Sequence, residues 1–142
     1  MSIPATLSAL CEMLHARTGV NVVLGRPDEA TSAIYVWPWL LEEDSHARNL
    51  SPAIGGGANS ARQPPSQNIH FLVIAAPALT AEGLSRLDQA RQALWNNPVL
   101  TVAGITVRVT ISTLETEQLA AVFQAAGIPL TICVSATVRG VS

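Results

Sequence analysis

The segment Asn68–Ala76 constrains the fold most strongly, because it is the most apolar stretch of the chain. A short and nearly continuous apolar run is typical of a strand that is buried on both faces. We therefore expect a central strand at these residues, in a sheet that has helices packed on it.

Periodic patterns before this segment predict one helix and two strands. Apolar residues recur at helical spacing over 3–17 and predict an amphipathic helix. β-Branched residues indicate a short strand over 20–24. A second strand is expected over 33–41, where Pro38 favours an edge position or a bulge because proline cannot donate to a ladder.

After the central strand, the sequence predicts a second helix. This helix is expected to begin at Thr80 or at Ser85, where Ser85–Asp88 resembles a capping box, and to end before Pro98. Its packed face would consist of Leu84, Leu87, Arg91, Leu94 and Trp95.

The last third of the chain predicts a strand pair, a helix and a strand. Alternation over 99–111 predicts a strand pair that turns at 103–104. The capping-box pattern Ser112–Glu115 is expected to begin a third helix, which Gly127 would end. The packed face of this helix would consist of Leu119, Val122, Phe123 and Ala126. Alternation over 130–138 predicts the final strand.

This order predicts an α+β fold with a mixed, mostly antiparallel sheet flanked by about three helices, because most strands follow one another without an intervening helix. The length of 142 residues suits a single domain spanning 1–142. Residues 46–66 contain several prolines, the run Gly55–Gly57 and few large apolar residues. A structureless segment of that length is uncommon in a compact domain, so we expect a long arm that faces a partner.

Charged residues are scarce, at 13% of the chain against roughly 25% in a typical soluble domain. The eight basic residues are all Arg, and ten acidic residues give a net charge of −2. The absence of Lys excludes a Walker-A or Schiff-base lysine, and the charge balance leaves no basic face for nucleic acid. Few charges on a chain that is 49% hydrophobic predict a surface covered by other copies or partners.

No pattern of catalytic or metal-ligating residues emerges. His15, His46 and His70 lack metal-ligand spacing, and we interpret His70 as a hydrogen-bonded core or interface residue. Gly55–Gly57 precedes neither a helix nor a Gly-Lys pair, so it predicts no phosphate site. We therefore expect a protein that is not an enzyme and that uses no cofactor and no metal.

The tryptophans and cysteines are interpreted as packing residues. Trp37, Trp39 and Trp95 are expected to anchor the core, with an aromatic binding surface as the alternative. Cys11 and Cys133 form no CxxC pair and suit two small buried hydrophobes in a reducing cytosol. No apolar run reaches the roughly 18 residues of a membrane span and no signal-peptide pattern begins the chain, so we expect a cytoplasmic protein without a membrane partner.

Three segments, taken in order, resemble a known family. Arg48-Asn49 follows the strand predicted over 33–41; residues 62–73 (Arg-Gln-Pro-Pro-Ser-Gln-Asn-Ile-His-Phe-Leu-Val) lead into the central strand; and residues 92–100 (Gln-Ala-Leu-Trp-Asn-Asn-Pro-Val-Leu) end a helix. Together with the elements over 111–138, they resemble the N-terminal domain of the cap, or tail-terminator, proteins of extracellular contractile injection systems. The resemblance covers residues 3–138.

This resemblance implies a phage tail-terminator-like fold and a structural role. Such a protein would form a hexameric ring that ends the inner tube and anchors the last ring of the contractile sheath. Its partners would be further copies of itself, the inner tube protein and the sheath protein. It would assemble in the cytoplasm and then become part of the particle. The alternative is a cytosolic adaptor or assembly chaperone for a phage-like particle.

A closed ring joins two different patches of each subunit, and the arm is expected to reach a neighbour. Arg48 and Arg62 would form bidentate pairs with acids such as Glu42 or Glu43 across that seam. The candidate interface comprises Arg48, Asn49, Arg62, Pro64, Pro65, Glu42 and Glu43.

Overall fold

The computed structural model of the chain describes residues 3–43 and 66–141. Its helices are α1 (Ile3–Thr18), α3 (Ala81–Asn96) and α4 (Thr116–Ala126). Its strands are β1 (Val22–Leu24), β2 (Ala33–Glu43), β3 (Gln67–Ala76), β4 (Val99–Val102), β5 (Ile105–Ser112) and β6 (Val134–Val141). These elements confirm the predicted α+β class.

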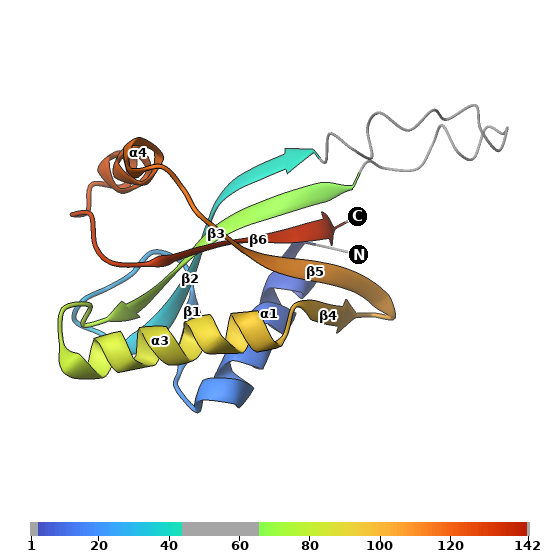
Figure 1. Ribbon diagram of the computed structural model, residues 1–142, viewed down its shortest axis with the longest axis horizontal. Coiled ribbons are helices and arrows are strands. Elements are labelled where there is room, and N and C mark those ends of the chain that lie inside the picture. The colour runs from blue at the N-terminus through green and yellow to red at the C-terminus, as the bar shows by residue number, and fades with distance from the viewer. Residues whose placement is uncertain (1–2, 44–65, 142) are drawn as a thin grey trace, which may run out of the picture.

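The strands form one six-stranded sheet in the order β1-β2-β3-β6-β5-β4 (Figure 1). β1 runs parallel to β2, and every other neighbouring pair is antiparallel. β3 lies between β2 and β6, and its residues Phe71–Ala76 are all buried. The predictions of a mixed, mostly antiparallel sheet and of a buried central strand are confirmed.

Pro38 lies at a bulge and not in an edge strand. The register between β2 and β3 shifts between Pro38 and Leu40, and β2 is the second strand of the sheet. A bulge inserts an extra residue and disrupts the ladder locally, so this position tolerates a residue without an N–H.

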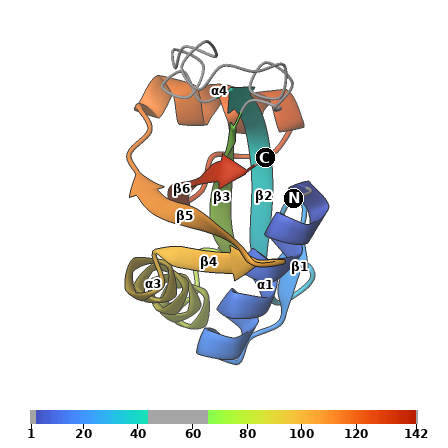
Figure 2. The same ribbon diagram turned by 90° about the vertical axis from the view of Figure 1, so that its right-hand side faces the viewer.

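One face of the sheet is covered by α1 and α3, which pack against each other (Figures 1 and 2). The larger hydrophobic core lies between these helices and the sheet. Leu10 and Leu14 of α1, Leu94 of α3 and Phe71 of β3 are all fully buried. Each side chain of this size contributes about 1.5–3 kcal/mol of hydrophobic stabilisation.

The opposite face is covered by α4 at one end only (Figure 1). Phe123 of α4 meets Trp37 edge-on, with ring centroids 5.4 Å apart and planes at 87°. The two rings belong to a second core that includes Leu72 and Ile74 of β3. At its other end, where the C-terminus of the chain lies, this face carries no helix among the residues that the structure describes (Figure 1).

α3 begins at the first of the two predicted positions. Thr80 is its N-cap, and the Thr80 hydroxyl accepts a hydrogen bond from the Gly83 N–H at 3.0 Å. Ser85 lies inside the helix, so the capping box predicted at Ser85–Asp88 is wrong.

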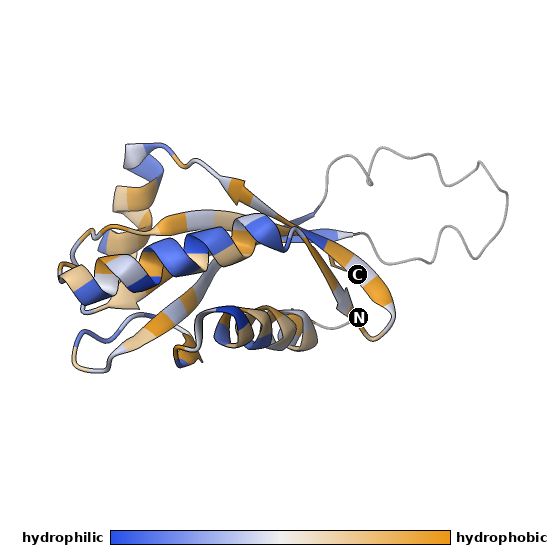
Figure 3. Cartoon of the chain, turned by 60° about the horizontal axis from the view of Figure 1, so that its bottom comes forward, coloured by the Kyte–Doolittle hydropathy of each residue, from blue (hydrophilic) through white to orange (hydrophobic). Residues whose placement is uncertain are grey.

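The packed face of α3 differs from the predicted one. Leu87 and Leu94 are buried as expected, whereas Leu84, Arg91 and Trp95 are exposed. The remaining buried positions are small residues, Gly83, Ala90 and Ala93. Small side chains let the helix lie close to its neighbours, so a pattern that counts only large apolar residues misplaces the face. The outward side of α3 carries several of its most hydrophilic residues (Figure 3).

The hairpin and the third helix largely follow the predictions. β4 and β5 pair as an antiparallel hairpin that turns at Ala103-Gly104. The predicted face of α4 is confirmed, because Phe123 is buried and its neighbours on that face pack with it. Gly127 ends the helix with a left-handed φ of 73°.

Two predicted boundaries are wrong. The capping box at Ser112–Glu115 does not form, because Ser112 is still paired with Ser135 in the sheet and the N-cap is Glu115, without a side-chain hydrogen bond. The last strand spans Val134–Val141 and not 130–138. The apolar side chains of Leu130 and Ile132 point to the surface from the segment before this strand.

Candidate functional site

Most of the predicted interface lies outside the described residues. Arg48, Asn49, Arg62, Pro64 and Pro65 fall in the segment 44–65, which the structure does not describe. The remaining two, Glu42 and Glu43, lie at the end of β2, where that segment begins.

Glu42 belongs to a hydrogen-bonded chain on the helix-free half of the sheet face. Its Oε1 lies 2.7 Å from Nε2 of His70, and Nδ1 of His70 lies 3.0 Å from the hydroxyl of Thr137. A carboxylate only accepts hydrogen bonds, so Nε2 carries the proton, and in the neutral ring Nδ1 accepts from Thr137. The interpretation of His70 as a hydrogen-bonded residue is confirmed.

The same half of the face presents polar side chains from β5 and β6. Thr110 lies opposite Thr137, and Ser112 lies opposite Ser135 with the two hydroxyls 3.1 Å apart. Val107, Val109 and Val138 point into the core, so the residues between them on these strands face the other way.

Arg108 and Arg139 lie directly opposite each other on this face. Within the described residues neither guanidinium forms an ion pair. Like charges directly opposite across two strands are destabilising. Glu42, His70, Arg108, Thr110, Thr137 and Arg139 are together named the polar face.

Two buried polar atoms of the sheet lack hydrogen-bond partners within the described part of the chain. They are the indole Nε1 of Trp39 and the amide Oδ1 of Asn68. Trp39 packs beside His70, with ring centroids 5.7 Å apart. A buried polar group without a partner costs about 1–3 kcal/mol, so the edge of the polar face is not optimised for stability alone.

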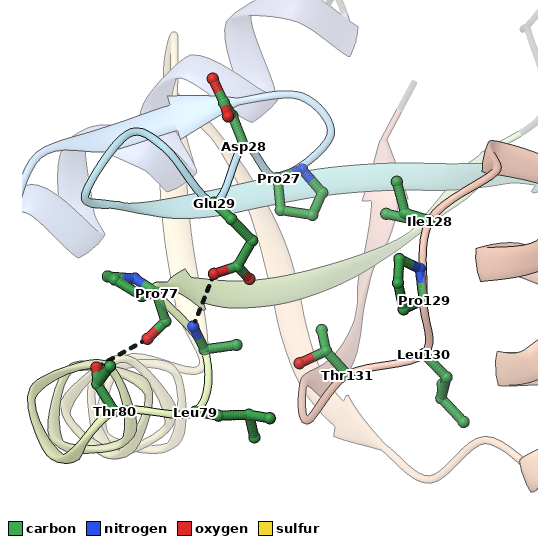
Figure 4. A pocket seen from close by; sticks show the side chains of 11 residues that line it. Pro27, Asp28, Glu29, Pro77, Leu79, Thr80, Ile128, Pro129, Leu130 and Thr131 are labelled. Atoms are coloured by element: carbon green, nitrogen blue, oxygen red, sulfur yellow. Dashed lines mark hydrogen bonds between the residues drawn. The ribbon is translucent and has the colours of Figure 1, made fainter.

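An apolar groove of about 590 Å³ lies at the end of the sheet that is opposite to the polar face. Figure 4 shows the side chains that line it. Three connections line it: residues 27–29 between β1 and β2, residues 77–80 between β3 and α3, and residues 128–131 between α4 and β6. Leu79 is 84% exposed and Leu130 is half exposed, so apolar surface is open to a partner here.

The apolar groove is held in shape by local contacts. A carboxylate oxygen of Glu29 accepts from the Ala78 N–H at 3.3 Å, and the Thr80 hydroxyl donates to the Pro77 carbonyl at 3.0 Å (Figure 4). A Cβ added at Gly83 would lie only 1.9 Å from the Pro77 oxygen. The first turn of α3 therefore seats directly on the connection that forms one wall.

Trp95 is 72% exposed at the C-terminal end of α3. Trp37 is buried and Trp39 is partly buried against the second core, as expected for core anchors. The expectation of a core anchor is wrong for Trp95, because the small residues of α3 form its packed face instead. A tryptophan with this exposure is unusual, since the residue is highly buried on average.

Both cysteines are free and partly buried. Burial raises the pKa of the Cys11 thiol, and the nearby Glu12 carboxylate raises it further. Burial also raises the pKa of the Cys133 thiol. A reactive cysteine requires a lowered pKa, so both thiols are held in the unreactive, protonated form.

Within residues 3–43 and 66–141, no group of three or more His, Cys, Asp and Glu side chains is placed to hold a metal ion. None of the described helices combines the length and the apolar character that a membrane crossing requires.

Sequence reasoning did not single out the apolar groove or the Arg108–Arg139 pair. The groove has a weak signal in Pro27, Pro77 and Pro129, each of which follows the end of a strand or helix. The arginine pair depends on a register between distant strands, which the sequence does not contain.

The fold is shared with solved structures of injection-system proteins. It superimposes on a chain of the sheath/tube terminator of an extracellular contractile injection system, PVC, in the extended state, with a TM-score of 0.72 and 17% identity. It also superimposes on a chain of the anti-feeding prophage cap, described as the AFP tube terminating cap, with a TM-score of 0.69 and 21% identity.

Each match covers 99% of this chain but only 56% and 54% of the solved chains, so this chain spans about half their length. The comparison with curated proteins gave no match. The family described as the Pvc16 N-terminal domain matches residues 5–142. This match confirms the resemblance drawn from the sequence, and the chain belongs to the Pvc16 N-terminal domain family.

Proposed function

We propose that this chain is a structural cap, or tail-terminator, subunit of a phage-tail-like contractile injection system. The observation that carries the proposal is the superposition of 99% of the chain on a sheath/tube terminator and on a tube terminating cap. In this role, six copies form a ring that ends the inner tube and anchors the last sheath ring.

The role needs binding surfaces and no chemical step. Each subunit of a closed ring uses two different lateral patches, and a terminator needs further contacts for the tube and for the sheath. The polar face, the apolar groove and Trp95 all present side chains to solvent, and they supply surface for several such contacts. Partners that cover these features account for the low charge content of the chain.

The predicted pairing of Arg48 or Arg62 with Glu42 or Glu43 remains part of this proposal. Glu42 uses Oε1 to accept from His70, and half of its side chain is exposed. An arginine of a neighbouring copy would therefore approach a carboxylate whose position His70 already fixes. A charge-assisted pair of this kind is about twice as strong as a neutral hydrogen bond.

The proposal is tested with purified chain, tube protein and sheath protein. We expect a species of six times 14.9 kDa in native mass spectrometry, alone or with tube protein. Adding the chain to polymerising tube protein should shorten the tubes and place the chain at one end in electron micrographs. A monodisperse monomer that binds neither tube nor sheath protein would contradict the proposal.

Purified particles separate this role from the alternative of an adaptor or assembly chaperone. A cap stays in the intact particle at a fixed ratio to the sheath. A chaperone is present during cytoplasmic assembly and absent from the finished particle. Quantitative mass spectrometry of intact particles measures that ratio.

A further inference from the structure

Two exposed apolar features lie at opposite ends of α3. The apolar groove includes Leu79 and Thr80, directly before the helix, and Trp95 lies in its last turn. The 16 residues of α3 correspond to a length of about 24 Å. Trp95 therefore cannot reach the groove of its own subunit.

We propose that Trp95 of one copy inserts into the apolar groove of the next copy, so that a chain of head-to-tail contacts joins the subunits. This inference rests on the proposed function, and it names the contact between neighbouring copies. The occupant of the groove is a second copy of this chain.

The groove offers a preformed apolar site. Three prolines, Pro27, Pro77 and Pro129, form part of its walls, and their rings fix the backbone φ. The hydrogen bonds of Glu29 and Thr80 tie two of the lining connections to their neighbours. A site that is already ordered loses little conformational entropy when it binds.

Trp95 has the properties of an anchor residue. It is 72% exposed, and a tryptophan buries about 150–250 Å² when it is fully enclosed. Trp, Tyr and Arg are the residues most enriched among those that dominate binding energy. Arg91 lies one helical turn before Trp95, with its side chain half exposed and paired only to Asp88 within the described chain.

Charge complementarity selects the second copy as the occupant. Among the described residues, the charged side chains that line the groove are two acids, Asp28 and Glu29, and both are exposed. Arg91, which also pairs with Asp88 at 2.9 Å, lies on the same side of α3 as Trp95 at a spacing of four residues. An apolar anchor beside a positive charge thus matches an apolar groove with a negative rim.

The geometry favours a ring over an isolated pair. A contact between two different patches is heterologous, and repetition of a heterologous contact closes into a ring when the rotation permits. Each copy would use its Trp95 end toward one neighbour and its groove end toward the other.

The test uses two variants that each damage one side of the contact. Trp95→Ala removes the anchor and leaves the groove intact, and Leu79→Asp damages the groove and leaves Trp95 intact. Both side chains are highly exposed, so the folded monomer is preserved. Ile105→Asp, an exposed apolar position in the β4–β5 hairpin, is the matched control.

Each variant alone is expected to be monomeric, with association weakened at least about 30-fold, as for a hot-spot residue. Mixing the two variants should restore one intact contact and give dimers of twice 14.9 kDa but no rings. Sedimentation velocity over a concentration series measures these species. The control Ile105→Asp should form rings as the unaltered chain does.

A charge reversal tests the electrostatic part separately. Arg91→Glu should weaken association about 10-fold, because it brings a like charge to the Asp28 and Glu29 carboxylates of the next copy. Arg91→Lys keeps the positive charge and should associate to within about 3-fold of the unaltered chain.

Rings formed by Trp95→Ala or Leu79→Asp, or a mixture of the two that stays monomeric, would overturn this contact. In those cases capping by the unaltered chain would leave the proposed function standing. An unaltered chain that stays monomeric with and without tube protein would overturn both.

Discussion

At the scale of single residues, the arginine pair on the polar face is the arrangement that most clearly lowers the stability of the fold. Arg108 and Arg139 lie directly opposite on adjacent strands, and neither has an ion-pair partner within the described residues. A cross-strand pair of opposite charge would stabilise the sheet, whereas like charges destabilise it. Residues that are kept at a cost to stability are expected to serve a contact with another molecule.

Replacing one arginine should therefore stabilise the isolated chain. Arg139→Glu creates a cross-strand ion pair with Arg108 and should raise the free energy of unfolding by about 0.2–1 kcal/mol. Urea denaturation measures the change, and about 1 M salt should remove most of it because the pair is exposed. The double variant Arg108→Glu with Arg139→Glu restores a like-charge pair and should lose the gain. A single variant that is less stable than the unaltered chain would contradict this account.

His70 connects a surface carboxylate with a buried hydroxyl. Thr137 is only 1% exposed, and its hydroxyl pairs with Nδ1 of His70. His70→Ala leaves that hydroxyl without its partner and should lower the free energy of unfolding by about 1–3 kcal/mol. Chemical denaturation measures the loss.

The matched control removes the hydroxyl together with the ring. Adding Thr137→Val to His70→Ala takes away the unpaired group, so the second change should cost less in this background than in the unaltered chain. Purely additive losses would show that the hydrogen bond contributes nothing measurable.

At the scale of elements, the sequence predicted what local periodicity determines. The helix over 3–17, the central strand and the packed face of α4 follow from the spacing of apolar residues, and the structure confirms them. The predicted face of α3 was wrong because its close packing depends on Gly83 and two alanines, which carry no periodic apolar signal.

The error at the last strand has a different cause. Residues 130–133 alternate like a strand, but the β3–β6 register ends at the pair Val73 and Val134. Beyond that pair, β3 is bonded to β2 alone. Pairing between distant strands, and not local alternation, decides where β6 begins. The same tertiary information positions Leu130 in the apolar groove, which is why the groove could not be predicted.

Gly83 couples the start of α3 to the apolar groove. In Gly83→Ala, the new Cβ would lie 1.9 Å from the Pro77 carbonyl oxygen, so the backbone must move. We expect a loss of stability of about 1–3 kcal/mol, the usual cost of overpacking, and weaker association of copies because a wall of the groove shifts. Thermal denaturation and sedimentation measure the two effects.

Ser85→Ala is the control, since Ser85 lies two residues further along the same helix and is exposed. It should leave both properties unchanged. A stable Gly83→Ala variant would indicate that the connection before α3 relaxes without cost.

At the scale of the whole molecule, the scarcity of charge now corresponds to particular surfaces. Large apolar side chains are exposed at both ends of α3, including Leu79, Leu130 and Trp95. Composition alone predicted that partners cover the surface, and the exposed apolar side chains are the places where we expect those partners to bind. The sequence also predicted an interface around the arm, whereas the exposed groove and Trp95 lie on the folded body. A ring subunit with several neighbours would need both.

The arm gives the last prediction, because it can be shortened without disturbing the sheet. β2 and β3 are antiparallel neighbours paired up to Glu43 and Gln67, so β2 ends and β3 begins at the same end of the sheet. Even a short loop can connect two such strands. Deleting residues 53–61 leaves ample length for that connection. Loop-closure entropy changes by only about 0.6 kcal/mol per doubling of loop length, so the monomer should keep its stability within that amount.

Association should respond differently from stability. If the arm reaches a neighbouring copy, the deletion should weaken ring formation while circular dichroism and the denaturation midpoint stay unchanged. A variant with 53–61 replaced by a Gly/Ser sequence of equal length separates the contribution of side chains from that of length. Equal weakening of ring formation in both variants would assign the contact to the side chains of 53–61. Weaker ring formation in the deletion alone would show that the length of the segment matters and not its side chains. Rings of unchanged stability in both variants would instead leave the lateral contact to Trp95 and the apolar groove.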